Sequence, residues 1–128
     1  MLREHEIEIR VRYQETDAQG RVHHGSYINY FEIGRVELLR AAGHSYKELE
    51  QQGILLVVTE LACEYYQGAE YDDVLRLRTT TARAKGVRIE HHYELTRDEQ
   101  LIVRGRTTVA SVDRTGRPRR LPEWLRLD

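Results

Sequence analysis

The fold is decided by residues 13–27, which read Tyr13-Gln14-Glu15-Thr16-Asp17-Ala18-Gln19-Gly20-Arg21-Val22-His23-His24-Gly25-Ser26-Tyr27. Residues 14–25 contain two glycines and no hydrophobic periodicity, which is typical of a loop. Residues 5–13, which come before this loop, alternate between apolar and charged side chains. Such alternation predicts a half-buried strand, with one face formed by Ile7, Ile9, Val11 and Tyr13.

Helical spacing begins at Ser26, directly after the loop. One face carries the apolar or small residues Tyr27, Phe31, Gly34, Leu38 and Ala41, and it is widened by Tyr30, Ile33 and Ala42. Gly43 follows this run and Arg40 lies in its last turn, as expected at the C-terminus of a helix. The pattern therefore predicts one long helix of about 17 residues, with a rather apolar face.

The remainder of the chain reads as a short helix followed by strands. Ser45-Tyr46-Lys47-Glu48 has the form of a capping box, and the helix it opens should end near Gly53. Four strand-like runs follow, at residues 54–66, 73–82, 87–96 and 101–113. Hairpin-sized connections at 84–86 and 97–100 suggest that these four runs form an antiparallel meander. The tail around Trp124 is expected to add one helical turn.

Five strands and one long helix predict an α+β fold in which a five-stranded antiparallel sheet wraps around the helix. The 128 residues fit a single domain, residues 1–128, and contain no repeat or linker. A sheet this small leaves antiparallel edges that can pair with a second copy of the chain. A homodimer, or a dimer of dimers, is therefore expected.

Composition excludes several classes of protein. Lys and Arg number 20 against 21 Asp and Glu, so no overall positive field would attract nucleic acid. We find no apolar run long enough for a membrane span or a signal peptide. Cys63 is the single cysteine, which excludes an internal disulfide and a cysteine zinc cluster. These features favour a cytoplasmic protein.

The loop between strand and helix is the place where chemistry is expected. A helix N-terminus presents free backbone N–H groups and a partial positive charge, which can stabilise a developing oxyanion. Thr16, Asp17, His23 and His24 all lie within reach of the predicted helix start. Asp17 has two interpretations at this point, because an aspartate in a turn also commonly bonds its own backbone.

The same residues resemble a known signature. Tyr13, Thr16-Asp17, Gly20, Val22, His24 and Tyr27, followed by Phe31-Glu32 and Arg35-Val36-Glu37, have the spacing of the opening motif of hydroxybenzoyl-CoA thioesterase-type hotdog enzymes, in particular the YbgC-like branch. The resemblance extends through the predicted strands to about Asp113. It departs from that branch in two places, with His23-His24 where Tyr-His is common and Gly68-Ala69 where Pro-Ala is common.

This resemblance implies hydrolysis of acyl-CoA thioesters without a metal or an organic cofactor. Asp17 matches the catalytic aspartate, acting either as nucleophile or as general base. His24 would supply its backbone N–H to the thioester carbonyl, although its side chain could instead act as an acid or base, or be solvated. The family's substrate lies at a dimer interface, and the motif residues expected to line its site are Tyr13, Thr16, Gly20, Val22, His23 and Tyr27.

Three cations form a weaker candidate site. Arg83, Lys85 and Arg88 cluster around a predicted hairpin turn and could meet the phosphates of CoA. A solvated charged turn explains the same cluster.

Two other functions compete with hydrolysis. A hotdog hydratase or dehydratase acting on enoyl thioesters would carry a histidine five residues after the aspartate, where this chain has Val22. A non-catalytic acyl-CoA binding module or sensor would carry an added DNA-binding segment, for which the chain has no room.

Overall fold

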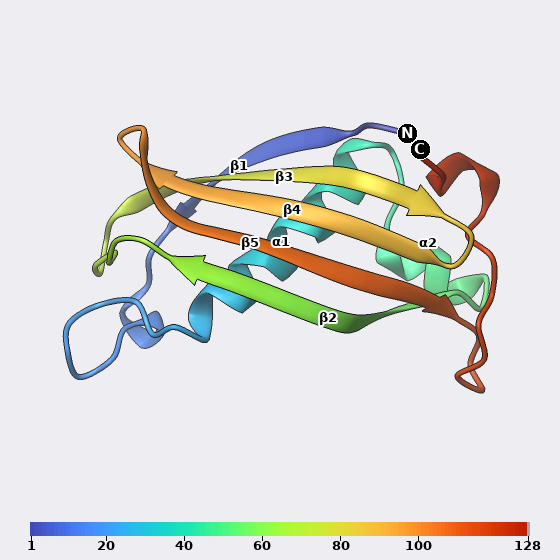
Figure 1. Ribbon diagram of the computed structural model, residues 1–128, viewed down its shortest axis with the longest axis horizontal. Coiled ribbons are helices and arrows are strands. Elements are labelled where there is room, and N and C mark those ends of the chain that lie inside the picture. The colour runs from blue at the N-terminus through green and yellow to red at the C-terminus, as the bar shows by residue number, and fades with distance from the viewer. Residues whose placement is uncertain (128) are drawn as a thin grey trace.

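The structure, a computed structural model, describes residues 1–127. Five strands and four helical segments follow one another along the chain (Figure 1). The strands are β1 (Glu4–Arg10), β2 (Leu55–Tyr65), β3 (Val74–Lys85), β4 (Arg88–Arg97) and β5 (Gln100–Val112). The helical segments are the short 3₁₀ turn η1 (Tyr13–Glu15), the long helix α1 (Ser26–Ala41), the short helix α2 (Tyr46–Gln51) and the turn η2 (Glu123–Leu125).

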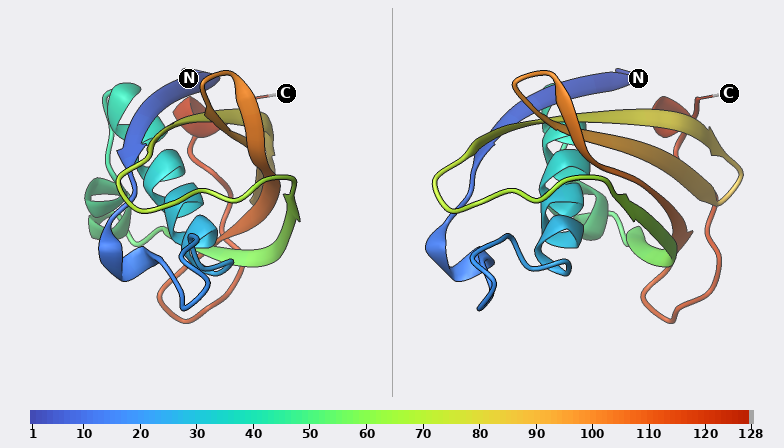
Figure 2. Two further views of the ribbon diagram at one scale, coloured as in Figure 1. Left: turned by 90° about the vertical axis from the view of Figure 1, so that its left-hand side faces the viewer. Right: turned by 60° about the vertical axis from the view of Figure 1, so that its left-hand side comes forward.

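The strands form one antiparallel sheet in the order β1-β3-β4-β5-β2. Viewed from its end, this sheet curls around α1, which lies on its concave side (Figure 2). The predicted α+β hotdog arrangement is confirmed. Among residues 1–127, we find no helix that is long and apolar enough to cross a membrane.

The predicted four-strand meander is wrong in one respect. Only β3, β4 and β5 are consecutive neighbours, whereas β2 pairs with β5 and lies at the edge of the sheet. The connection at residues 66–73 therefore crosses from one side of the sheet to the other instead of forming a hairpin. The reason is that alternation along a strand specifies its two faces and carries no information about its neighbour.

Helix α1 packs closely against the middle of the sheet because small residues stand at the contact points. A Cβ atom added at Gly34 would clash with Thr79 and would lie 2.7 Å from Cδ2 of Leu77 on β3. A Cβ added at Gly105 on β5 would clash with the ring of Phe31. Side chains larger than hydrogen would thus push α1 away from the sheet, which explains why glycine occupies both positions.

The helix buries a somewhat different face from the one that the spacing predicts. Tyr27, Tyr30, Phe31 and Leu38 are buried as expected, but Ile33 is 39% exposed. Arg35 lies in the buried face although it carries a charge, and it is only 9% exposed. Burial of an arginine is uncommon and requires polar partners.

Residue patterns within a few positions of one another correctly predicted the start of α2 and the β4–β5 hairpin. Ser45 Oγ accepts a hydrogen bond of 3.1 Å from the backbone N–H of Glu48, so the predicted cap of α2 is present. The β4–β5 turn places both Asp98 and Glu99 at positive φ, as a two-residue hairpin turn requires. The helical turn predicted near Trp124 is η2.

Candidate active site

The loop that carries Asp17 is a small closed turn at the end of the molecule where α1 begins (Figure 1). The backbone N–H of Asp17 donates to the carbonyl of Arg21 at 2.8 Å, and that of Gly20 donates to the carbonyl of Asp17 at 3.0 Å. Gly20 has a φ of +79°, which favours glycine at this turn. Asp17 therefore occupies a fixed position at the base of the turn.

One of the two carboxylate oxygens of Asp17 is hydrogen-bonded within its own loop. Its Oδ1 accepts a 2.9 Å hydrogen bond from the backbone N–H of Gln19. Its Oδ2 has no hydrogen-bond partner among residues 1–127. The turn interpretation and the catalytic interpretation are thus compatible, because one oxygen orients the group and the other stays available.

Glu15 connects the loop to both neighbouring elements. Its Oε1 accepts hydrogen bonds from the hydroxyl of Tyr30 at 2.7 Å and from the backbone N–H of Arg12 at 2.8 Å, and its Oε2 pairs with the Arg12 guanidinium at 2.9 Å. Burial alone would raise the pKa of Glu15, but the hydrogen bonds from Arg12 and Tyr30 together hold it below its usual value. The carboxylate is therefore charged at neutral pH.

The backbone of Glu15 performs a second connecting role. Its carbonyl accepts from the backbone N–H of His23 at 2.8 Å and from the hydroxyl of Ser26 at 3.0 Å. Ser26 is the first residue of α1. Glu15, which lies two residues before Asp17 in the chain, thus holds the start of the helix. The sequence analysis did not select this residue.

The N-terminus of α1 leaves backbone donors free. Gly25 forms its N-cap without a side-chain cap, and the N–H of Gly25 itself donates to Nδ1 of His23 at 3.0 Å. The N–H groups of His24 and Tyr27 make no hydrogen bond within the described part of the chain. Unpaired donors at a helix start are suited to an anionic oxygen.

His24 is held by its backbone and by its ring. Its carbonyl accepts a 3.1 Å hydrogen bond from the hydroxyl of Tyr65 on β2, which fixes the helix start to the edge strand. Its ring stacks on that of His23, with centroids 4.1 Å apart. Tyr65 was not among the predicted site residues.

The predicted substrate-binding residues fall into two groups. Val22 and Tyr27 are core residues with 5% and 3% exposure, so they support the loop from beneath. Tyr13 is 78% exposed and its ring packs edge-on against Tyr71 at 5.6 Å. Thr16 bridges to Val22, and its hydroxyl donates to the carbonyl of Tyr13. In the single chain, the outward-facing members are therefore Tyr13, Thr16, Gly20 and His23.

Arg83, Lys85 and Arg88 lie far from Asp17 in the same chain. They surround the β3–β4 hairpin, at the opposite end of the sheet from the Asp17 loop (Figure 1). The eleven steps from Val74 to Lys85 along β3 correspond to roughly 36 Å of extended strand. All three cations line a hollow of about 670 Å³ on the outer face of the sheet.

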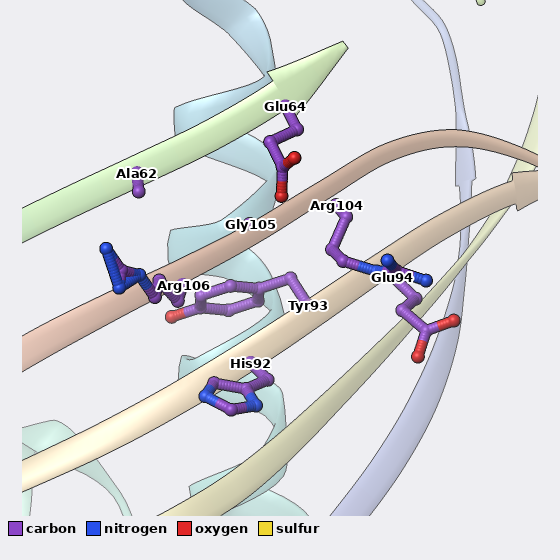
Figure 3. A pocket seen from close by; sticks show the side chains of 8 residues that line it. All are labelled: Ala62, Glu64, His92, Tyr93, Glu94, Arg104, Gly105 and Arg106. Carbon is purple, nitrogen blue, oxygen red and sulfur yellow. The ribbon is translucent and has the colours of Figure 1, made fainter. Parts of the chain in front are cut away.

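A second hollow, of about 180 Å³, lies on the same outer face further along β4 and β5 (Figure 3). Its rim carries charged side chains from the three adjacent strands β2, β5 and β4. Along each strand, every second residue faces away from α1, and on this outer face those residues are largely charged. Glu64, Arg104 and Glu94 stand opposite one another in register. Glu94 forms an ion pair with Arg78 at 3.2 Å. We assign the side chains of this hollow no part in the chemistry proposed for Asp17.

The structure was also searched for side chains that could hold a metal ion. Within the described residues, no group of three or more His, Cys, Asp and Glu side chains is placed to hold a metal ion. Cys63 is a partly buried thiol on β2 whose pKa is raised by burial, which disfavours the reactive thiolate.

Comparison with known proteins gives a consistent result. The model of the thioesterase-like superfamily matches residues 11–127. The chain is 36% identical to the acyl-CoA thioesterase YbgC of Haemophilus influenzae over 82% of its length and 78% of the relative. It is 32% identical to the acyl-CoA thioester hydrolase YbgC of Escherichia coli O157:H7, covering 91% of this chain and 89% of the relative.

A solved structure agrees with the fold. A probable thioesterase from Bartonella henselae superposes with a TM-score of 0.88 at 30% identity, covering 93% of this chain and 99% of that one. The chain belongs to the thioesterase-like superfamily and, within it, to the YbgC-like hotdog-fold thioesterases.

Proposed function

We propose that the protein hydrolyses acyl-CoA thioesters to a carboxylic acid and free CoA, with Asp17 as the reacting carboxylate. The observation that supports this most directly is that one loop and the helix start that follows it carry both an Asp17 Oδ2 without a hydrogen-bond partner and N–H groups, those of His24 and Tyr27, that are also unpaired in the described chain. One group can activate the attacking species and the other can stabilise the charge that develops on the substrate. The activities named for the relatives are of the same class.

In the general-base route, Asp17 takes a proton from a water molecule as the water oxygen attacks the thioester carbonyl carbon. The carbonyl oxygen becomes an oxyanion and accepts a hydrogen bond from the N–H of His24. Collapse of this intermediate breaks the C–S bond, and the leaving thiolate takes up the proton. In the nucleophilic route an oxygen of the Asp17 carboxylate bonds to the carbonyl carbon, and the C–S bond breaks with release of the CoA thiolate, which takes up a proton. Water then cleaves the resulting anhydride, which releases the carboxylic acid and restores the Asp17 carboxylate.

We also propose that two copies pair through β2. This edge strand exposes Val57, Val58 and Leu61 at 42%, 49% and 42% respectively. An unpaired edge with apolar side chains on it is a site for pairing with another strand. An isologous dimer is the commonest solution for a single chain, because the same patch then serves both subunits.

Such a dimer would bring the cationic hairpin to the Asp17 loop of the other copy. In a two-fold pairing the two β2 strands run antiparallel, so the Tyr65 end of one faces the Leu55 end of the other. Arg88 lies two strands away from Val57 through Ala110, a distance of about 10 Å. Arg83, Lys85 and Arg88 are therefore proposed to bind CoA phosphates across the subunit interface.

The proposal is tested by a panel of acyl-CoA esters with aromatic, short aliphatic and longer acyl groups. We expect release of free CoA from at least one ester, and loss of that release when Asp17 is replaced. Hydration of crotonyl-CoA is assayed in parallel, because a hydratase would act on it faster than any thioester is cleaved. Tight binding of CoA esters without turnover would instead identify a binding module.

The hydratase alternative receives no support from the site. The position five residues after Asp17 is Val22, whose side chain is buried in the core at 5% exposure. A second acid–base group is therefore missing from the place where a hydratase dyad would need it. Hydrolysis remains the proposed activity.

A further inference from the structure

The peptide group that joins His24 to Gly25, at the start of α1, is held at both of its polar ends. Its carbonyl oxygen accepts a 3.1 Å hydrogen bond from the hydroxyl of Tyr65 on β2. Its N–H, which belongs to Gly25, donates to Nδ1 of His23 at 3.0 Å. Two side chains, one from the loop and one from the edge strand, therefore fix a single peptide group.

The preceding peptide group, between His23 and His24, is held only at its carbonyl end. That carbonyl accepts a hydrogen bond of 2.9 Å from the backbone N–H of Ser26. The N–H at the other end, that of His24, makes no hydrogen bond within residues 1–127 and is the donor proposed for the thioester oxygen. Because the two planar peptide groups share the Cα atom of His24, fixing one of them restricts the direction in which this N–H points.

Tyr65 has the properties that such an anchor requires. Its ring packs against the ring of Tyr27, with centroids 5.7 Å apart, so the side chain is supported from the helix. Partial burial, followed by the hydrogen bond with Cys63, raises the pKa of the Tyr65 hydroxyl to about 12. The hydroxyl therefore keeps its proton at neutral pH and remains a donor to the carbonyl of His24.

The ring of His23 lies directly against Gly25. Gly25 has ordinary right-handed helical angles, with φ at −72° and ψ at −22°, so its backbone conformation does not require glycine. A Cβ atom added there would lie 3.2 Å from Nδ1 and 3.3 Å from Cε1 of the His23 ring, which is a tight contact. A tyrosine at position 23, which is common in the YbgC-like branch, has a ring carbon in place of Nδ1 and could not accept this hydrogen bond.

We propose that Tyr65 and His23 are positioning residues for the hydrolysis: together they clamp one peptide group and so aim the His24 N–H at the thioester oxygen. This inference rests on the proposed function, because the oxyanion forms only during acyl transfer. A donor that is held in place before the reaction stabilises the developing charge without reorganisation. Loosening the clamp should therefore slow the chemical step more than it weakens substrate binding.

Tyr65→Phe removes the hydroxyl and keeps the ring against Tyr27. Removing an oxyanion donor outright lowers kcat by about 10²–10³, so a donor that is less well aimed should lower kcat roughly tenfold, with KM changed by about twofold or less. The matched control is Tyr66→Phe, because Tyr66 is also 48% exposed and its hydroxyl makes no hydrogen bond in the described chain. This control should keep normal turnover. An unchanged kcat in Tyr65→Phe overturns the role of Tyr65.

Two variants of His23 separate the hydrogen bond from the bulk of the ring. Asparagine can place its side-chain oxygen near the position of Nδ1 and accept from the N–H of Gly25, whereas leucine has no acceptor. We expect His23→Leu to lower kcat roughly tenfold and His23→Asn to restore about half or more of the original value. Equal kcat values in the two variants would overturn the role of His23.

Amide NMR of the full-length chain tests the clamp without turnover. Tyr65→Phe should shift the amide signals of His24 and Gly25 and speed their hydrogen exchange, because the peptide group between them loses one anchor. Tyr66→Phe should leave both signals in place. If Tyr65→Phe also leaves them in place, the hydroxyl does not hold this peptide group and the clamp is refuted.

Asp17→Asn distinguishes failure of the clamp from failure of the proposed function. If Asp17→Asn keeps normal turnover, the proposed function of Asp17 is wrong, whatever the amide signals of His24 show. If Asp17→Asn is inactive while Tyr65→Phe and His23→Leu keep full kcat, only the positioning role is wrong. Loss of turnover in Asp17→Asn, with partial loss in the two clamp variants, supports both.

Discussion

The hydroxyl of Tyr30 donates a 2.7 Å hydrogen bond to Oε1 of Glu15, joining the second turn of α1 to the loop that precedes Asp17. The acceptor is charged and its side chain is only 12% exposed. Burial, followed by the hydrogen bond to Glu15, raises the pKa of the Tyr30 hydroxyl, so it remains a donor at every physiological pH. The geometry of the loop that carries Asp17 therefore depends on this pair.

Replacing Tyr30 by Phe removes the hydroxyl and leaves the ring in place. Because a hydrogen bond to a charged group contributes about 1.5–3 kcal/mol, we expect the free energy of unfolding to fall by that amount. Urea denaturation measures it. The matched control is Tyr71→Phe, since Tyr71 is 56% exposed and its hydroxyl makes no hydrogen bond in the described chain. Equal losses in both variants would argue against a special role for the Tyr30–Glu15 pair.

Asp17→Asn keeps the shape of the side chain and its Oδ1 hydrogen bond to Gln19, but removes the base or nucleophile. We expect turnover of acyl-CoA to fall by about two to four orders of magnitude while the protein stays folded. Asp72→Asn, in another exposed turn, is the control and should keep normal turnover. Asp72 has a φ of 72°, a conformation that asparagine tolerates. Near-normal turnover by Asp17→Asn would show that Asp17 is not the reacting group.

His91 should make the protein less stable in acid. Its pKa is lowered to about 3 in the folded chain, against 6.5 ordinarily. Below about pH 6.5 the unfolded chain therefore binds a proton that the folded chain does not bind until about pH 3. The free energy of unfolding should fall through this range by up to about 1.4 kcal/mol per pH unit from this residue.

His91→Leu removes this contribution and isolates it from other acid effects. Urea denaturation at constant chloride concentration, from pH 8 to pH 4, gives the free energy of unfolding for both proteins. The difference between them should be constant above about pH 7.5 and should change steadily in favour of the variant as the pH falls. Parallel curves over the whole range would show that His91 is protonated equally in both states.

Gly34→Ala should weaken the packing of α1 on β3. The added Cβ would meet Thr79 and would lie 2.7 Å from Cδ2 of Leu77. Overpacking of this kind costs about 1–3 kcal/mol, which exceeds the gain of up to about 1 kcal/mol in helix propensity. The control is Asn29→Ala, which is exposed on the same helix and should change the free energy of unfolding by about 0.5 kcal/mol or less. A higher free energy of unfolding for Gly34→Ala than for the original chain would mean that α1 can move away from β3 without loss of packing.

Val58→Lys tests the proposed pairing of β2 strands. Val58 is 49% exposed on the edge strand, and a lysine there would place two like charges at the centre of a two-fold interface. In size-exclusion chromatography with light scattering, we expect the original chain to elute as a dimer and the variant as a monomer. Val74→Lys adds the same charge at a residue that is 41% exposed on β3, and should leave the dimer intact. If both variants elute as dimers, the interface does not involve Val58 on β2.

Local patterns in the sequence predicted most of the elements. The alternation of Leu75 and Leu77 with Arg76 and Arg78 predicts a strand, and the structure buries the two leucines completely. The Ser45 cap and the hairpin turns were likewise predicted, since each is specified by residues a few positions apart. Glu15 accepts a hydrogen bond from the backbone N–H of Arg12, three residues earlier, which is a local contact. Its contact with Tyr30, fifteen residues later, could not be anticipated.

The sequence by itself thus determined the strands, the long helix and the loop that holds Asp17, because hydrophobic period and turn chemistry act over short distances along the chain. Only the tertiary structure decided that β2 pairs with β5, that Arg35 is buried beside His91, and that the cationic hairpin lies far from Asp17. These relationships depend on contacts between residues distant in sequence. Periodicity tells which face of an element is buried but carries no information about the partner that covers it.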